Sequence, residues 1–194
     1  MFCRFVPKLI TGKDVCELSD DGNPGAFNVF KHCGAKVGCL CLFLDALKGF
    51  APVLCAGFIL NTESYLFSLV IFAPVLGHAA GVFNRFRGGK CIAVSFGVMF
   101  GLIPVTYWGI ILLAVLYILF SLVKISSNRI RSIIVYSLFL LASAIIMNVF
   151  GFHTAAAGCG LISLTAVAKH LISVKPPQSV RADTELTEFL HNDK

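Results

Sequence analysis

A short basic segment with two adjacent glycines is the strongest chemical signal in this sequence. Residues 73–97 read APVLGHAAGVFNRFRGGKCIAVSFG, so the basic segment lies between two apolar stretches. Gly88 and Gly89 let backbone N–H groups turn towards a bound oxyanion, because neither residue has a Cβ atom to block the approach. His78 precedes the basic segment by about one or two helical turns. The cations that would supply the counter-charge are Arg85, Arg87 and Lys90.

This segment has two interpretations. In the first, an anionic group docks against the glycines and the cations. In the second, the segment is only a positively charged loop that joins two transmembrane helices at the cytosolic face. The sequence of the segment taken alone leaves both open.

A second polar motif lies near the N-terminus. Residues 22–25 read GNPG, a strong turn signal, and a helix is predicted to start at Pro24 or Gly25. Asn23 and Asn28 would then offer amide donors near a helix N-terminus, where positive partial charge accumulates. The alternative is that this motif is only a turn.

An ionisable pair interrupts the apolar run at 37–60. Asp45 and Lys48 are three residues apart, so on a helix they share one face and can pair. Ionisable groups at membrane depth are costly and normally face the interior of a bundle, which makes the pair a site hypothesis. A structural ion pair, or one placed near the lipid headgroups, is the alternative.

Composition decides the fold class. The chain has 194 residues, of which 57% are hydrophobic and only 13% charged, and it contains 18 Phe. These values exclude an average soluble domain and predict an all-α, polytopic helical membrane protein. The formal net charge of +6 is better explained by cytosolic loops than by nucleic-acid binding, because the cations are dispersed between apolar segments.

About six transmembrane helices follow from the apolar runs. The run at 91–123 is too long for one crossing, and Pro104 divides it. The last helix is rich in small residues, which favour close helix packing. The predicted spans are 37–60, 65–82, 91–103, 106–123, 132–150 and 155–174.

The distribution of Lys and Arg supports this topology. Alternate connections carry cations, at 84–90, 124–131 and 169–194, whereas the connections at 61–64, near 104 and at 151–154 carry none. A multi-pass protein with both termini in the cytosol satisfies every loop. The same topology places the two polar motifs, the 124–131 loop and His170 on one membrane face.

Three regions follow from these patterns. They are a cytosolic N-terminal segment at 1–36 that holds the glycine and asparagine motif, a membrane helical bundle with cytosolic basic loops at 37–174, and a polar C-terminal tail at 175–194. No signal peptide is predicted. The eight Cys include no CxxC pair and no His at ligand spacing, so we expect reduced thiols and no metal site or disulfide framework.

Three stretches together resemble a known family. GNPGAFNVFKHCGAKVG at 22–38, LDALKGFAPV at 44–53 and PVLGHAAGVFNRFRGGKCIAVSFG at 74–97 are similar in order and spacing to the bacterial acyl-phosphate:glycerol-3-phosphate acyltransferases, the PlsY family. The resemblance implies an integral enzyme of the bacterial plasma membrane with its active face in the cytosol. Its substrates would be acyl phosphate and glycerol 3-phosphate, its product lysophosphatidate, and its surroundings membrane lipid. No cofactor is implied, and the sequence leaves the oligomeric state open.

The resemblance also implies roles for individual residues. The catalytic residues would be His78, Lys90 and His170. The substrate-binding residues would be Asn23, Asn28, Lys31, Arg87, Gly88, Gly89 and Ser127.

The sequence departs from the family pattern at several of these positions. Two acidic residues at 20–21 replace a Gly-Ser pair, Phe27 replaces Thr, Lys31 replaces Arg, and Cys91 replaces the last glycine of GGKG. Residues 7–22 look like the segment that normally follows the family's first transmembrane helix, so we expect a divergent member that lacks this helix.

These departures leave two hypotheses from different classes. The first is a working, divergent acyltransferase. The second is a catalytically degenerate relative that acts as a lipid- or partner-binding membrane protein. A small transporter is disfavoured, because the polar groups cluster at one membrane face and not at the bilayer midplane.

Overall fold

The protein is built from helices that pack side by side. A computed structural model describes residues 2–19, 22–23, 25–81, 88–125 and 127–172, and these residues contain no strand. The helices are α1 (Phe2–Thr11), α2 (Val15–Leu18), α3 (Ala26–Cys33), α4 (Ala35–Ile59), α5 (Tyr65–Ala80), α6 (Ile92–Gly101), α7 (Trp108–Leu122), α8 (Asn128–Val149) and α9 (His153–Ile172).

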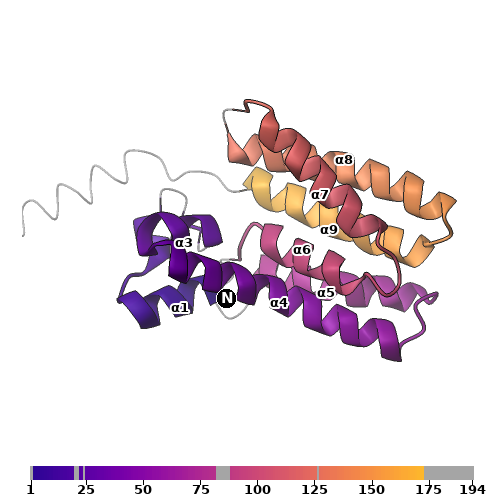
Figure 1. Cartoon of the computed structure of the whole chain (residues 1–194), viewed down its shortest axis with the longest axis horizontal. Helices are drawn as coiled ribbons and strands as arrows, with labels where there is room; N and C mark the ends of the chain where they lie inside the picture. Colours follow the sequence, from indigo (N-terminus) through magenta and orange to yellow (C-terminus); the bar gives the residue numbers. More distant parts are fainter. Residues whose placement is uncertain (1, 20–21, 24, 82–87, 126, 173–194) are drawn as a thin grey trace, which may run out of the picture.

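The last six of these helices form a bundle in which successive helices run in opposite directions (Figure 1). In the bundle α4 packs against α6, α9 packs against both α5 and α8, and α7 packs against α8. The three short helices α1–α3 sit at one end of the bundle, where α4 begins (Figure 1). This alternation brings the C-terminal ends of α5, α7 and α9 to the same end as the N-terminal ends of α6 and α8.

The predicted helices agree with the observed ones apart from several boundaries. The predicted helix start at Pro24 or Gly25 is wrong, because Gly25 is the extended N-cap residue of α3, which begins at Ala26. Helix α5 was expected to reach residue 82 but ends at Ala80, because Gly81 adopts the left-handed conformation with φ of 59°.

Helix α8 also begins earlier than expected, at Asn128 and not at residue 132. The Arg131 N–H donates to the Ser127 carbonyl at 3.0 Å, which starts the helical ladder before the apolar run begins. Arg129 and Arg131 therefore lie in the first turn of a helix and not in a loop. The expected break at Pro104 is confirmed, since α6 ends at Gly101 and α7 begins at Trp108.

Two groups of buried apolar side chains hold the helices together. The larger one joins helices α4 to α9, and its fully buried members include Ile71, Val98 and Phe139. A smaller one, with Cys3 and Val29 among its members, fixes α1–α3 to the first half of α4. The N-terminal helices are therefore a separate layer on the bundle.

Helices α4 and α6 approach each other through glycine. A Cβ atom on Gly97 of α6 would lie 1.9 Å from the Ala46 carbonyl oxygen of α4, and one on Gly49 of α4 would lie 2.4 Å from the Val94 carbonyl oxygen. Because no side chain separates the two backbones, α6 can hold its N-terminus close to the polar residues of α4.

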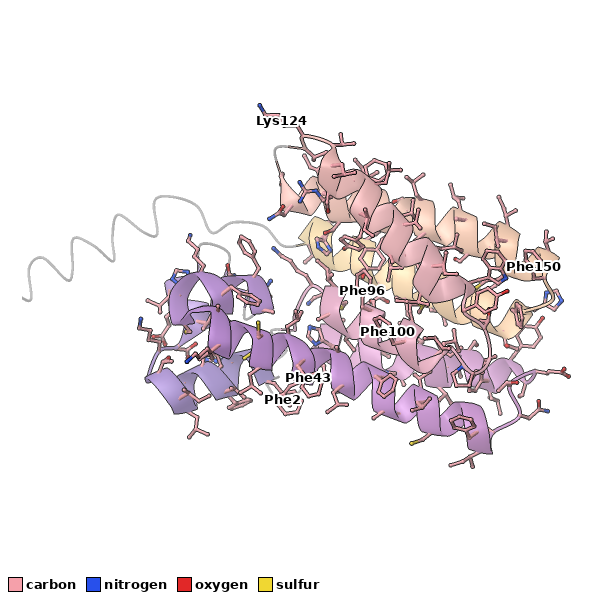
Figure 2. All side chains as sticks on the ribbon, in the orientation of Figure 1. Phe2, Phe43, Phe96, Phe100, Lys124 and Phe150 are labelled. Carbon is pink, nitrogen blue, oxygen red and sulfur yellow. The ribbon has the colours of Figure 1, made fainter. Side chains whose placement is uncertain are left out.

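The outer face of the bundle is apolar. Large side chains on several helices are exposed, among them Leu66 at 72%, Leu141 at 60% and Ile145 at 64%. Phe43 of α4 and Phe100 of α6 are exposed as well (Figure 2). Helices α4, α8 and α9 are long and apolar enough to cross a membrane, and α5, α6 and α7 are shorter apolar helices. An apolar outer face of this extent is suited to lipid contact.

The α4–α6 contact yields a stability prediction. We expect Gly97→Ala to lower the free energy of unfolding by about 1–3 kcal/mol, because the added methyl group forces the two backbones apart. Thermal unfolding in detergent measures this change. Gly160→Ala in α9 is the matched control, since its Cβ would meet only Leu140 at an ordinary 3.5 Å. Equal stability of the two variants would contradict the close packing of α4 on α6.

The Asp14 carboxylate ties α1 to α2. It accepts hydrogen bonds from the Cys16 N–H at 3.0 Å and from the Arg4 guanidinium at 3.1 Å, and Lys8 Nζ lies 3.7 Å from it. Burial by itself would raise the pKa of Asp14, but the hydrogen bonds from Arg4 and Cys16 outweigh burial and hold this pKa below its ordinary value.

This lowered pKa predicts a pH dependence of stability. The contribution of Asp14 to the free energy of unfolding is fully present above its unfolded-state pKa of about 3.9. It is lost as the pH falls through the lower folded-state pKa. We expect Asp14→Asn to destabilise the protein at pH 7 by about 1 kcal/mol, because Asn keeps the cap but loses the charge that pairs with Arg4 and Lys8. The difference from wild type should be constant near neutral pH and begin to shrink as the pH falls below about 3.9. Thermal unfolding from pH 7 to pH 3 checks this, with the exposed Glu63→Gln as control; a difference independent of pH would contradict it.

Candidate functional site

A pocket of about 560 Å³ opens at the end of the bundle where α1–α3 lie. Residues from helices α3 to α9 and from the segments before α3 and α6 line it. The elements meet there because successive helices run in opposite directions. The predicted site residues that line it are Asn23, Asn28, His78, Lys90 and His170.

The charge of the pocket lining is basic. Lys90, Arg129 and Arg131 line it, and Asp45 is the single acidic residue in the described part of the lining. The Asp45 carboxylate is already paired with the Lys48 ammonium of the same helix. An excess of cations inside an apolar bundle favours an anionic ligand.

The two arginines are held by backbone contacts at the helix ends. The Arg129 guanidinium donates to the Leu171 carbonyl at 2.7 Å, and the Arg131 Nε donates to the Phe120 carbonyl at 3.0 Å. Each guanidinium has five N–H donors in a planar fork, so these contacts leave donors for a ligand. They also fasten the start of α8 to the ends of α7 and α9.

The glycine segment packs against the backbone at the end of α5, next to His78. The Gly89 N–H donates to the His78 carbonyl at 3.2 Å, and a Cβ on Gly88 would lie 1.8 Å from the Ala79 carbonyl oxygen. Gly88 is therefore needed for close packing of this segment on the end of α5. The Gly89 N–H serves this packing, whereas the sequence suggested that it faces an anion.

Cys91, which follows this segment, has a strained backbone. Its φ is 68°, in the left-handed region that favours glycine, and it is the N-cap residue of α6. Its thiol is buried and lies 3.5 Å from the Gly89 carbonyl oxygen. The strained residue therefore directly follows Lys90 in the chain.

Other predicted site residues lie elsewhere. Lys31 is exposed on α3 and Ser127 is the N-cap residue of α8; neither belongs to the pocket lining. Arg87, Arg85 and the two acidic residues at 20–21 lie outside the described residues, as does the tail at 175–194.

The sequence did not single out several polar residues of the lining. Tyr117 donates to Ser132 at 3.4 Å, and Ser121 donates to the Tyr117 carbonyl at 2.6 Å. Tyr117 and Ser121 are polar residues four apart at the end of an otherwise apolar run, which is a weak signal for a shared helix face. Arg129 and Arg131 were visible in the sequence only as loop charges.

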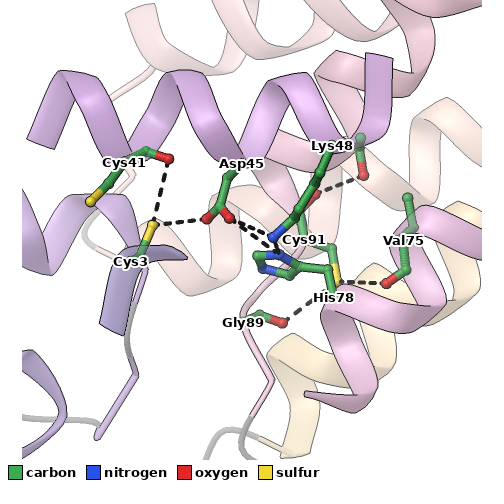
Figure 3. A network of polar contacts seen from close by, with 9 residues as sticks. Cys3, Cys41, Asp45, Lys48, Val75, His78, Gly89 and Cys91 are labelled. Carbon is green, nitrogen blue, oxygen red and sulfur yellow. Dashed lines mark hydrogen bonds and ion pairs between the residues drawn. The ribbon is translucent and has the colours of Figure 1, made fainter. Parts of the chain in front are cut away.

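A buried network joins three helices at the edge of the pocket (Figure 3). Lys48 Nζ contacts Asp45 Oδ1 and lies 2.5 Å from Nδ1 of His78, which is itself 3.9 Å from Asp45 Oδ1. The Cys3 thiol of α1 donates to Asp45 Oδ2 at 2.8 Å. The predicted pairing of Asp45 with Lys48 is confirmed, and the pair contacts His78, which lines the pocket.

Fold and pocket together define a class: an all-helical protein with a lipid-suited outer face and a basic pocket at one end of its bundle. Residues 1–175 match the family described as glycerol-3-phosphate acyltransferase. The chain belongs to this family. It is therefore a polytopic helical membrane protein.

Individual relatives agree with this assignment. The glycerol-3-phosphate acyltransferase of Lawsonia intracellularis is 39% identical over 116 residues, which are 60% of this chain and 52% of that protein. Glycerol-3-phosphate acyltransferase 2 of Thermotoga maritima is 38% identical over 122 residues, which are 60% of this chain and 61% of that protein. The matched part thus spans between about half and three-fifths of these relatives.

Two crystal structures of PlsY (YgiH), an integral membrane glycerol 3-phosphate acyltransferase, have the same fold. The glycerol 3-phosphate form has a TM-score of 0.64 and 28% identity, and the lysophosphatidic acid form has a TM-score of 0.65 and 29% identity. In both cases the similarity covers 87% of this chain and 84% of the other.

The geometry of the glycine segment gives a binding prediction. We expect Gly88→Ala to weaken the binding of inorganic phosphate by about tenfold, which corresponds to 1.4 kcal/mol. The added Cβ displaces the segment from α5 and Lys90 from the pocket. Isothermal titration calorimetry measures the affinity. Gly57→Ala, whose Cβ would meet only Val105 at 3.4 Å, is the control; unchanged affinity in Gly88→Ala would contradict this account.

Proposed function

We propose that this protein transfers a fatty acyl group from acyl phosphate to glycerol 3-phosphate, giving lysophosphatidate in phospholipid biosynthesis. The observation that carries the proposal is the basic pocket, which is lined by Lys90 from the segment before α6 and by Arg129 and Arg131 from the first turn of α8. Both substrates carry a phosphate, and a site with three cations can hold both. Family membership supports the same reaction, as do the glycerol 3-phosphate and lysophosphatidic acid forms of the solved relative.

The pocket also has an apolar side that suits the acyl chain. Phe27 and Phe30 of α3, Leu42 of α4 and Ile92 of α6 line it, and both Phe27 and Leu42 are partly exposed on the outer face. A ligand with a charged head and a long apolar chain can therefore place its head among the cations and its chain towards lipid.

The proposed reaction mainly requires that the two substrates are positioned and that their negative charge is neutralised. The 1-hydroxyl oxygen of glycerol 3-phosphate attacks the acyl carbonyl carbon, and the bond between that carbon and the phosphate oxygen breaks. The hydroxyl proton passes to a phosphate oxygen, and inorganic phosphate leaves. Acyl phosphate is already activated, so cations that stabilise the departing phosphate and hold the two substrates together supply the main rate enhancement.

In this proposal the predicted residues that line the pocket keep their roles, whereas Gly88 and Gly89 act through the packing of their segment on α5. Lys90 binds the phosphate of acyl phosphate, and His78 and His170 bind the reacting groups. Asn23 and Asn28 hold glycerol 3-phosphate: the Asn28 amide donates to the Asn23 carbonyl at 2.8 Å, which orders the turn before α3. Lys31 and Ser127, which are outside the pocket lining, and Arg87, which lies outside the described residues, remain proposed substrate contacts on the strength of the family resemblance alone.

The membrane orientation follows from the same arrangement. The connections at the pocket end of the bundle hold Lys90 and Lys124, whereas the described connections at the other end, 60–64, 102–107 and 150–152, hold no Lys or Arg. Lys124 lies at the turn between α7 and α8 (Figure 2). By the positive-inside rule the pocket opens to the cytosol of a bacterial cell membrane, where both phosphorylated substrates are available.

An acyl-transfer assay tests the proposal. Purified protein in lipid, given acyl phosphate and labelled glycerol 3-phosphate, should form lysophosphatidate. We expect Lys90→Ala to lower kcat/KM by about 100-fold or more, because a charge that stabilises the transition state is lost. Lys36→Ala is the control, since Lys36 is exposed on α4 and outside the pocket lining.

Two results would decide against the proposal. If Lys90→Ala formed lysophosphatidate at the wild-type rate, the basic pocket would not be the site of the reaction. Phosphate binding that depends on Lys90, without any product from the wild type, would favour the alternative of a catalytically degenerate, binding relative.

A further inference from the structure

The contact between Lys48 and His78 determines which nitrogen of the imidazole carries the proton. A charged lysine ammonium has three donors and no acceptor. The Asp45 carboxylate and the Lys48 ammonium form an ion pair, in which Lys48 Nζ contacts Asp45 Oδ1. His78 Nδ1 lies 2.5 Å from the same Nζ, so Nδ1 must be the acceptor and carries no hydrogen. The ring hydrogen is then on Nε2.

The opposite arrangement holds for the second histidine of the pocket. His170 is buried, and its Nδ1 lies 2.8 Å from the Ala166 carbonyl oxygen, which can only accept. Nδ1 of His170 therefore carries a hydrogen, and its Nε2 is an acceptor in the neutral ring. The two histidines line one pocket with opposite hydrogen-bonding character.

The contacts of Cys3 and Lys48 stabilise the tautomer of His78 that carries its hydrogen on Nε2. Cys3 of α1 donates to the other carboxylate oxygen of Asp45, so both oxygens have a partner and the carboxylate is fixed in place. The Lys48 ammonium also lies 5.8 Å from the centre of the Phe2 ring. These contacts come from α1, α4 and α5, and further ionisable groups that act on His78 or its partners include Cys41, Cys91 and Lys169.

We propose that Asp45 and Lys48 are positioning residues that hold His78 with its proton on Nε2, so that His78 donates a hydrogen bond to a phosphate oxygen or to the developing oxyanion in the pocket. This inference rests on the proposed acyl transfer and deepens it. In this inference His78 contacts the substrate directly, because it lines the pocket, and Lys48 acts only through His78. His170 complements it by accepting a hydrogen bond from the hydroxyl group of the acceptor substrate.

Nitrogen NMR of the full chain tests the tautomer without any need for turnover. The protein is labelled with 15N-histidine and studied in detergent, and His78→Gln identifies the His78 signals. We expect an unprotonated Nδ1 and a protonated Nε2 in the wild type and in Lys48→Arg, which keeps a donor at this place. A protonated Nδ1 of His78 in the wild type overturns the proposal.

Lys48→Met provides the complementary variant. It removes the ammonium and keeps most of the side-chain volume, and we expect it to release His78 to a mixture of the two tautomers. Lys36→Met on the exposed face of the same helix is the matched control and should leave the spectrum unchanged. A folded Lys48→Met protein with the wild-type His78 spectrum would also count against the proposal.

A double-mutant cycle separates positioning from a general structural role. We expect Lys48→Met and His78→Gln each to lower kcat about 10- to 100-fold, as loss of a charge-assisted hydrogen bond does, with little change in KM. The double variant should lose no more than either single variant, because Lys48 acts only through His78. Additive losses would overturn the positioning role, whereas a wild type without activity refutes the acyl transfer and leaves the tautomer to the NMR result.

Discussion

The neutralisation of one buried carboxylate organises the site end of this protein. Asp45 is 2% exposed on a helix that is otherwise apolar, and an isolated charge there would cost several kcal/mol. Its partners come from three helices: Lys48 on its own helix, Cys3 on α1 and, through Lys48, His78 on α5. The requirement to pair this charge therefore fixes the relative positions of α1, α4 and α5 beside the pocket.

Close packing of α6 on α4 and of the segment before α6 on α5 fixes further elements around this carboxylate. Gly97 and Gly49 let the backbones of α6 and α4 touch, and the segment before α6 ends against the carbonyl groups of α5. Lys90 lies between these two contacts and is therefore placed by backbone packing. The strained conformation of Cys91 is held by the same packing, since its buried thiol lies between the Gly89 and Val75 carbonyl groups.

The pocket combines cations from helix ends with apolar side chains from helix flanks. Arg129 and Arg131 bind the last carbonyl groups of α9 and α7, which are the negative ends of those helices. A site built in this way can meet water on one side and lipid on another, as the proposed reaction between a water-soluble phosphate and an acyl phosphate requires. Family membership and the fold of the solved relatives are consistent with this design.

The sequence by itself determined the fold class, the helix order and several residues of the pocket lining. Long apolar runs with cations in alternate connections dictate antiparallel membrane helices, because charge and hydropathy are properties of local sequence. For the same reason the pairing of Asp45 with Lys48 and the placing of His78, Lys90 and His170 at one end could be predicted. The ends of α3, α5 and α8 could not be placed from composition, since they depend on backbone hydrogen bonds at Gly25, Gly81 and Ser127.

Only the tertiary structure decided which residues meet. It brought Arg129, Arg131 and Tyr117 into the pocket, left Lys31 on the surface and turned the Gly89 N–H towards the His78 carbonyl. It also set the protonated nitrogen of His78, which depends on Lys48 thirty positions earlier in the chain. Side-chain direction and contacts between distant segments arise from packing, and packing is a property of the whole bundle that no local pattern contains.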